Sequence, residues 1–366
     1  MKFGWRGALG ILLSVGFLIL AFRGIRFGEV ITLVRHANVG LLLLSVVAAT
    51  CTFPLRARRW RPILDPVAPN LPFGKLFSAT AIGMMLNNVL PARAGEPARA
   101  YALSRSTPSV SFPAAFASLA VDRLLDMIVM FGLMFLAMLD PAFPRGAEIL
   151  NRPVSSYAVV GLAAMTGLTA AMYAVVFFPS HVLSLYEMLA RRIAPKLEAK
   201  GRAAVSSIIH GLSVLRQPSR FAAVFGWTLA HWLCNALAFW IGFRAFGIMV
   251  PFSAALFLQG LVAIGVAAPQ MPGFFGVFEW FGQLGLGLYG VPSDTAVAWA
   301  ITYHGLSFIP ITLIGAWCLV RAGLSIGELS GTERGAERGA ERGAERGTAP
   351  DTDADVGTSR SVVSES

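Results

Sequence analysis

Six long apolar runs dominate this chain of 366 residues. A bilayer core about 30 Å thick needs about twenty residues of helix to cross it, so each run predicts a membrane-spanning helix. Hydrophobic residues make up 55% of the chain and charged residues 14%, which is far from the balance of a soluble protein. The expected fold is an all-α polytopic membrane protein with about six full spans, at Gly7–Phe22, Ala37–Leu55, Phe112–Leu139, Ser155–Phe178, Phe221–Phe246 and Thr295–Val320.

The formal net charge of +10 comes from basic residues in the connections between these runs. If the chain starts inside the cell, the inner connections hold 17 Lys and Arg and the outer ones hold 5. This asymmetry follows the positive-inside rule, and it predicts a multi-pass protein of the cell (inner or plasma) membrane with both termini in the cytoplasm. The same rule accounts for the charge without a nucleic-acid partner.

Two further apolar segments, Leu76–Leu90 and Ser253–Ala268, are too short to cross a bilayer comfortably. Each leads into a turn with the pattern Pro-x-x-x-Gly, and an even number of crossings requires each to enter and leave on one side. We therefore expect two re-entrant or broken-helix segments. Paired interrupted segments in matching places are the sequence pattern that points to a transporter's substrate site.

The expected membrane domain covers residues 1–328, with halves at about 7–178 and 221–325. The order of long and interrupted segments is similar in both halves, which predicts a possible inverted repeat. The connector 179–220 contains apolar residues at helical spacing beside basic ones, so it forms either an amphipathic helix on anionic lipid headgroups at the cytoplasmic face or a polar linker. Residues 329–366 repeat Gly-Ala-Glu-Arg and then become acidic, a composition typical of a disordered tail.

The first turn combines asparagines at the end of an apolar segment with two arginines and a glutamate. Guanidinium groups suit phosphate, and the glutamate supplies an acceptor or a proton carrier. The alternative is an ordinary cytoplasmic loop whose arginines follow the positive-inside rule. The candidate substrate-binding or gating residues here are Asn87, Asn88, Pro91, Arg93, Gly95, Glu96 and Arg99.

Three charged residues, Asp122, Arg123 and Asp126, interrupt the apolar run that begins at Phe112. Charges at membrane depth are costly and are usually functional or tightly paired. Arg123 and Asp126 are three apart and can pair on one helix face. These residues form either a site for proton coupling or for holding Arg93, or a buried ion pair that fixes helix packing.

The second turn carries an isolated acid, Glu279, which is either a proton acceptor or the partner of Arg244 in a salt bridge. His304 lies in the middle of the last span and is a candidate for the same site. The candidates from this half are Gln259, Gln270, Pro272, Gly273, Gly276, Glu279 and His304.

No motif for catalysis or metal binding stands out. No cluster has the spacing of metal ligands, and no glycine-rich nucleotide loop follows a strand. We therefore expect no cofactor and no metal, and a transporter rather than an enzyme. The oligomeric state does not follow from these features.

Three motifs in order resemble the lysylphosphatidylglycerol synthase transmembrane family, the flippase-like membrane proteins: Asn88–Ala100 (NVLPARAGEPARA), Asp122–Asp126 (DRLLD) and Pro272–Glu279 (PGFFGVFE). The likeness runs over most of residues 7–325. It implies movement of a phospholipid or glycolipid between leaflets. The chain has no soluble aminoacyltransferase domain, so aminoacyl transfer is not implied. Phe274 stands where the family commonly has a second glycine.

The resemblance and the charged turns together predict a membrane lipid flippase or lipid transporter for a phospholipid or a phosphate-linked glycolipid. Two alternatives remain open. One is a lipid-modifying membrane transferase acting on a polyprenyl-phosphate or phospholipid, and the other is an importer of a small polar solute.

Overall fold

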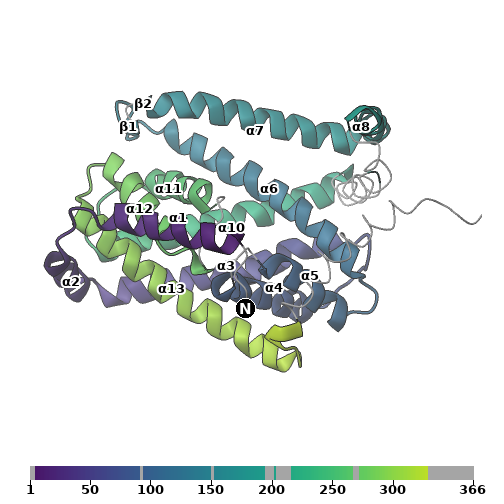
Figure 1. The fold of residues 1–366 in the computed structure, drawn as a ribbon, viewed down its shortest axis with the longest axis horizontal. Coiled ribbons are helices and arrows are strands. Elements are labelled where there is room, and N and C mark those ends of the chain that lie inside the picture. Colours follow the sequence, from purple (N-terminus) through teal and green to yellow (C-terminus); the bar gives the residue numbers. More distant parts are fainter. Residues whose placement is uncertain are drawn as a thin grey trace, which may run out of the picture.

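The computed structural model describes residues 5–90, 94–149, 152–193, 202, 216–266 and 272–328, and helices dominate these residues (Figure 1). The first half contains α1 (Trp5–Phe22), α2 (Phe27–His36), α3 (Val39–Leu64), α4 (Phe73–Val89), α5 (Gly95–Ser106), α6 (Phe112–Met138) and α7 (Val154–Phe177). A two-residue antiparallel pair, β1 (Glu148–Ile149) and β2 (Arg152–Pro153), precedes α7. The second half contains α8 (Pro179–Ile193), α10 (Pro218–Ala245), α11 (Phe252–Val266), the 3₁₀ turn η3 (Pro272–Phe274), α12 (Val277–Leu288) and α13 (Ser293–Arg321).

Within the described part of the chain, three helices, α3, α10 and α13, are long and apolar enough to cross a membrane, and the bent pair α7 and α8 makes a fourth if it counts as one span. The helix α6 has 27 residues but carries three charges in its middle. The structure confirms an all-α polytopic membrane protein. Length and composition support three or four spans among the described residues. The expected count of six is therefore only approximate.

The two halves repeat the same order of elements. In the first half the long α3 is followed by the short α4 and α5 and the long α6, and in the second half α10, α11, α12 and α13 follow the same order. Their lengths agree closely, at 26, 17, 12 and 27 residues against 28, 15, 12 and 29. Each interrupted segment is thus the first arm of a helical hairpin, as expected, and both hairpins return as helices.

Each hairpin has its own hydrophobic core. One core contains Trp60, Ile82, Leu86, Leu103 and Leu125, from α3 to α6. The other joins the second half of α6 to α10, α11, α12 and α13. The helix α13 packs against both α4 and α12, so it connects the two hairpins.

Glycine permits the close approach within the first hairpin. A Cβ on Gly95 would lie 1.9 Å from the carbonyl oxygen of Gly83, and a Cβ on Gly83 would lie 2.7 Å from the carbonyl oxygen of Gly95. The Gly95 amide also donates to Asn87 Oδ1 at 2.9 Å. Only glycine at these two positions therefore allows α4 and α5 to pack with their backbones in contact.

Two helix boundaries differ from the sequence-based expectation. The second apolar run was expected to end at Leu55, but α3 continues to Leu64 through one further proline, Pro62, and four arginines. The connection after α1 was expected to be a loop, but it contains α2, which Asp294 anchors by accepting hydrogen bonds from the backbone and side chain of Arg26. In both places a polar sequence folds as helix because one of its faces packs on the protein.

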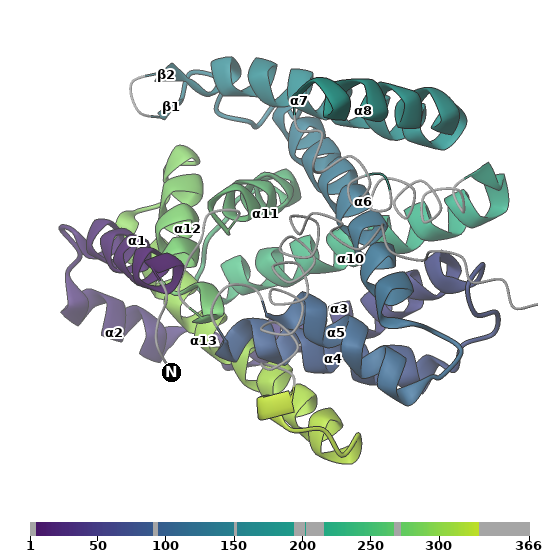
Figure 2. The same cartoon turned by 45° about the vertical axis from the view of Figure 1, so that its right-hand side comes forward.

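The helices α7 and α8 lie at the edge of the molecule. The helix α7 runs alongside α6 (Figure 1), and α8 leads away from the end of α7 (Figure 2). The axes of α7 and α8 differ by 109°. Exposed apolar side chains follow one face of α8, at Leu185, Met188 and Leu189. The helix α8 covers the first part of the connector 179–220, and the amphipathic association of this connector with a membrane surface stays a prediction.

Candidate functional site

The extension of α3 brings two arginines into the protein interior. Phe53, Arg56, Trp60 and Leu64 recur at helical spacing and are all buried, which places Arg56 on the core-facing side of the helix. Arg59 lies beside this stripe and has no exposed surface. Arg56 and Arg59 therefore face α6 and not water.

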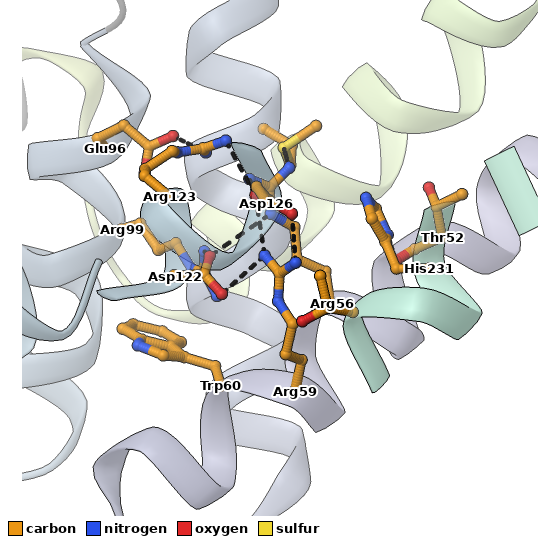
Figure 3. Close-up of polar contacts among 12 residues, drawn as sticks. Thr52, Arg56, Arg59, Trp60, Glu96, Arg99, Asp122, Arg123, Asp126 and His231 are labelled. Carbon is orange, nitrogen blue, oxygen red and sulfur yellow. Dashed lines mark hydrogen bonds and ion pairs between the residues drawn. The ribbon is translucent and has the colours of Figure 1, made fainter. Parts of the chain in front are cut away.

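The centre of the site is a pair of aspartates on α6 that share Arg59 (Figure 3). Arg59 Nη2 lies 2.7 Å from Asp122 Oδ1 and 3.1 Å from Asp126 Oδ2, and Arg59 Nη1 also contacts Asp126 Oδ1. Trp232 of α10 donates its indole N–H to Asp126 at 2.8 Å. Because the aspartates are four residues apart, they lie on one face of α6, and one guanidinium spans both.

Arg99 of α5 reaches one of these aspartates, Asp122, from the first hairpin. Its Nη1 donates to Asp122 Oδ2 at 3.1 Å, and its guanidinium carbon lies 4.0 Å from the ring centroid of Trp60. The Trp60 indole in turn donates to Ser118 Oγ at 2.8 Å. Trp60 therefore fixes the plane of the Arg99 guanidinium by a cation–π contact.

The cluster opens toward the surface at Glu96 and Arg123. These two side chains form an ion pair, and 22% of the Glu96 side-chain surface and 39% of that of Arg123 are exposed. The side chains of Arg59 and Asp122 have no exposed surface. Arg123 also lies 3.4 Å from Asp126, which is the helical pair that the sequence predicted. The cluster thus extends from an accessible end to a fully buried end.

We call this set the arginine–carboxylate cluster, and it holds more positive than negative charge. Its members are four arginines and three carboxylates: Arg56, Arg59, Arg99, Arg123, Glu96, Asp122 and Asp126. Several buried N–H groups of the cluster lack a hydrogen-bond acceptor among the described residues, namely Nε of Arg56, Nε of Arg59, and Nε and Nη2 of Arg99. Buried donors are normally satisfied, so these groups favour an anionic ligand at this position.

A second buried polar contact lies in the other hairpin. The Glu279 carboxylate accepts from the Gly276 amide at 2.6 Å and lies 2.7 Å from His304 Nδ1. The alternative partner, Arg244, contacts Met249 and the Val250 carbonyl instead, so the proposed salt bridge between Glu279 and Arg244 is not formed. Glu279 also pairs with no arginine of the cluster among the described residues.

The remaining candidates lie apart from these two groups. Asn88 donates to Thr312 of α13 at 3.3 Å, and Gln259 accepts from Asn235 of α10 at 3.2 Å. Pro272 and Gly273 form η3, where Gly273 and Phe274 have φ of 72° and 62°. Phe274 therefore takes a conformation that glycine adopts more easily. Three candidates lie outside the described residues: Pro91, Arg93 and Gln270.

Sequence reasoning missed Arg56 and Arg59 because they follow the apparent end of an apolar run. The available signal was the helical spacing of Arg56 with Trp60. If the helix continues past Leu55, these two residues lie on the same buried face. Among the described residues no group of three or more His, Cys, Asp or Glu has an arrangement suited to a metal ion.

These features define a class: a multi-pass helical membrane protein with two helical hairpins and a buried, net-positive cluster beside one of them. The chain belongs to the family described as the lysylphosphatidylglycerol synthase TM region, whose model matches residues 7–315. The predicted resemblance is therefore confirmed.

The chain is similar to curated proteins of three organisms. A UPF0104 membrane protein of Pyrococcus horikoshii is 24% identical over 81% of this chain and 91% of its own length, and a UPF0104 membrane protein of Methanothermobacter thermautotrophicus is 26% identical over 82% and 88%. The glycosyltransferase AglD of Haloferax volcanii is 34% identical over 139 residues. That match covers 38% of this chain and only 22% of AglD.

Proposed function

We propose that this protein moves a phosphate-bearing membrane lipid between the two leaflets. The observation that carries the proposal is the surplus of buried arginine in the arginine–carboxylate cluster. Four guanidinium groups meet three carboxylates, and one monoanionic phosphate diester would balance the charge.

Arg99 is the residue best suited to hold the phosphate. One edge of its guanidinium is occupied by Asp122, while its Nε and Nη2 have no acceptor among the described residues. Two parallel N–H donors match two phosphate oxygens, and such charge-assisted bonds are about twice as strong as neutral ones. Trp60 stacks on the flat face of the Arg99 guanidinium and therefore does not cover this edge.

The accessible end of the cluster supports a route for the headgroup. Arg123 is exposed by 39% of its side-chain surface, so a lipid phosphate meets this arginine first. The phosphate would replace Glu96 as the partner of Arg123 and would then move on to Arg99. The acyl chains would stay in the bilayer, which the apolar exterior of the helices allows.

The direct test uses the purified protein in liposomes that contain a fluorescent phospholipid in both leaflets, with a membrane-impermeant quencher added outside. The proposal predicts that the protected half of the signal is lost faster than in protein-free liposomes. Unchanged protection with phosphatidylglycerol, phosphatidylethanolamine and a polyprenyl-phosphate sugar, with and without a proton gradient, would contradict it.

A lipid-modifying transferase is the second candidate, and the match to the glycosyltransferase AglD favours it. The same cluster would then hold the phosphate of a lipid substrate during a transfer reaction. This function predicts a lipid of changed mass in membranes that contain the protein, detected by mass spectrometry. A transporter changes only the leaflet in which the lipid lies.

A further inference from the structure

A buried polar contact in the second hairpin takes no part in the proposed binding of phosphate. Gln259 lies in the middle of α11, an otherwise apolar helix whose only other side chain with a hydrogen-bonding group is Ser253. Only 2% of the Gln259 surface is exposed. Its Oε1 accepts a hydrogen bond from Nδ2 of Asn235 on α10 at 3.2 Å. An amide at such a position is costly unless its polar atoms are hydrogen-bonded.

Half of this amide has no hydrogen bond. No described residue accepts from Gln259 Nε2, although the atom is buried. Buried donors are nearly always paired, so an unpaired one indicates a ligand. Asn235 is only half-buried, and the amide pair is therefore accessible from the side of α10.

The helix α10 joins this amide pair to the arginine–carboxylate cluster. Trp232 donates to Asp126 of α6, and Asn235, three residues further along, donates to Gln259 of α11. Residues three apart lie on the same face of a helix. The helices α6 and α11 also touch beside the pair, because a Cβ on Gly260 would lie 2.8 Å from a side-chain atom of α6. The amide pair therefore lies where three helices meet, about one turn of α10 beyond the cluster.

The chemistry of the two amides fits a hydroxyl group. A hydroxyl both donates and accepts, so it can pair with an amide N–H and with an amide oxygen. A phosphate needs a cation, and among the described residues no hydrogen bond joins either amide to an arginine. An amine needs a carboxylate, and the one that α10 binds, Asp126, is already paired with Arg56, Arg59 and Arg123.

We propose that Asn235 and Gln259 form a subsite for the hydroxyl groups of the lipid headgroup. The free Nε2 of Gln259 donates to a hydroxyl oxygen, and an amide oxygen of the pair accepts from a hydroxyl. The subsite selects a headgroup with hydroxyls, such as glycerol or a sugar, over ethanolamine. It rests on the proposed function in that the cluster holds the phosphate of the same lipid.

Binding of matched short-chain lipids to the full-length protein in a non-ionic detergent tests this subsite. Phosphatidylglycerol and phosphatidylpropanol share the phosphate diester and a three-carbon headgroup, and only the first has hydroxyls on that headgroup. By calorimetry we expect the wild type to bind phosphatidylglycerol about tenfold more tightly. A short-chain alkyl glucosyl phosphate is the third ligand. The lower Kd of the two hydroxyl-bearing lipids shows whether the hydroxyls come from glycerol or from a sugar.

Gln259→Met keeps the length of the side chain and removes the amide. It should weaken phosphatidylglycerol alone and bring the two Kd values to within about twofold of each other. Unchanged binding of phosphatidylpropanol in this variant shows that the fold and the phosphate site are intact. The control is Gln283→Met, the same substitution at a half-buried position on α12, which should keep the tenfold preference.

Equal Kd values for the two lipids in the wild type, or a preference that survives in Gln259→Met, would overturn the subsite. Arg99→Gln should weaken both lipids alike and leave their ratio unchanged, which separates the phosphate site from the hydroxyl subsite. The leaflet assay is an independent measurement. A protein that shows the hydroxyl preference and moves no lipid refutes the proposed function and leaves the subsite standing, whereas a wild type that binds neither lipid overturns both.

Discussion

Arg59 and Asp122 lie 2.7 Å apart, on different helices, and neither side chain has any exposed surface. The same arginine also binds Asp126, so one guanidinium joins α3 to two successive turns of α6. Such a pair is costly to bury and costly to break, because removal of one partner leaves a charge without compensation. Arg59 therefore holds the helices in place, and the other arginines of the cluster remain available for a ligand.

Arg59→Gln should destabilise the protein by about 3–5 kcal/mol, since it leaves two buried aspartates short of a cation. The measurement is the free energy of unfolding by chemical denaturation in mixed detergent micelles. Arg58→Gln is the matched control, because Arg58 is the adjacent residue on α3, is exposed, and has its guanidinium over the ring of Phe73. It should cost about 1 kcal/mol or less. Equal losses in the two variants would show that Arg59 has no special role.

Gly95→Ala should prevent the first hairpin from closing, because the added Cβ would lie 1.9 Å from the Gly83 carbonyl oxygen. We expect a lower unfolding temperature and increased proteolysis between α4 and α5. Gly132→Ala on α6 is the control, since outside the local backbone of α6 no described atom lies within 4 Å of its added Cβ, and it should be neutral or stabilise the helix by up to about 1 kcal/mol. A Gly95→Ala protein as stable as Gly132→Ala would contradict the backbone contact.

The face of α8 that carries Leu185 should lie in the membrane surface. The 109° bend after α7 places α8 across the membrane plane if α7 spans it. A nitroxide or fluorophore on Leu185→Cys should be quenched by lipid-soluble reagents, and one on Glu187→Cys, about 200° around the helix, by water-soluble reagents. Equal access of water-soluble reagents at both positions would place α8 away from the lipid. The three native cysteines are replaced beforehand.

The sequence predicted the hairpins well and the charged cluster only in part. The Pro-x-x-x-Gly turns and short apolar segments are local signals, and both hairpins form around them. Arg56 and Arg59 were counted among the basic residues of an inner connection, because the positive-inside rule treats every arginine after an apolar run as solvated. Only the packing of α3 against α6 shows that these side chains are buried.

A similar limit applies to the partners of the acidic residues. Asp126 and Arg123 are three residues apart, so their pairing was predicted from helix geometry and is observed. Glu279 and His304 are on different helices, and the sequence left open both Arg244 and a site shared with His304.

With Arg56, Arg59 and Arg99 buried, 14 basic residues remain on the predicted inner face against 5 outside, so the prediction of cytoplasmic termini keeps its basis.

The most direct test of the central claim is the affinity of the arginine–carboxylate cluster for a lipid phosphate. Calorimetry in a non-ionic detergent measures the Kd of short-chain phosphatidylglycerol for the wild type, for Arg99→Gln and for Arg58→Gln. The control lipid is a diacylglycerol with the same chains and no phosphate. We expect Arg99→Gln to raise the Kd about tenfold or more, since hydrogen bonds to charged groups are each worth about 1.5–3 kcal/mol, and Arg58→Gln to leave it unchanged. An unchanged Kd in Arg99→Gln, or equal binding of the phosphate-free lipid, would contradict the account.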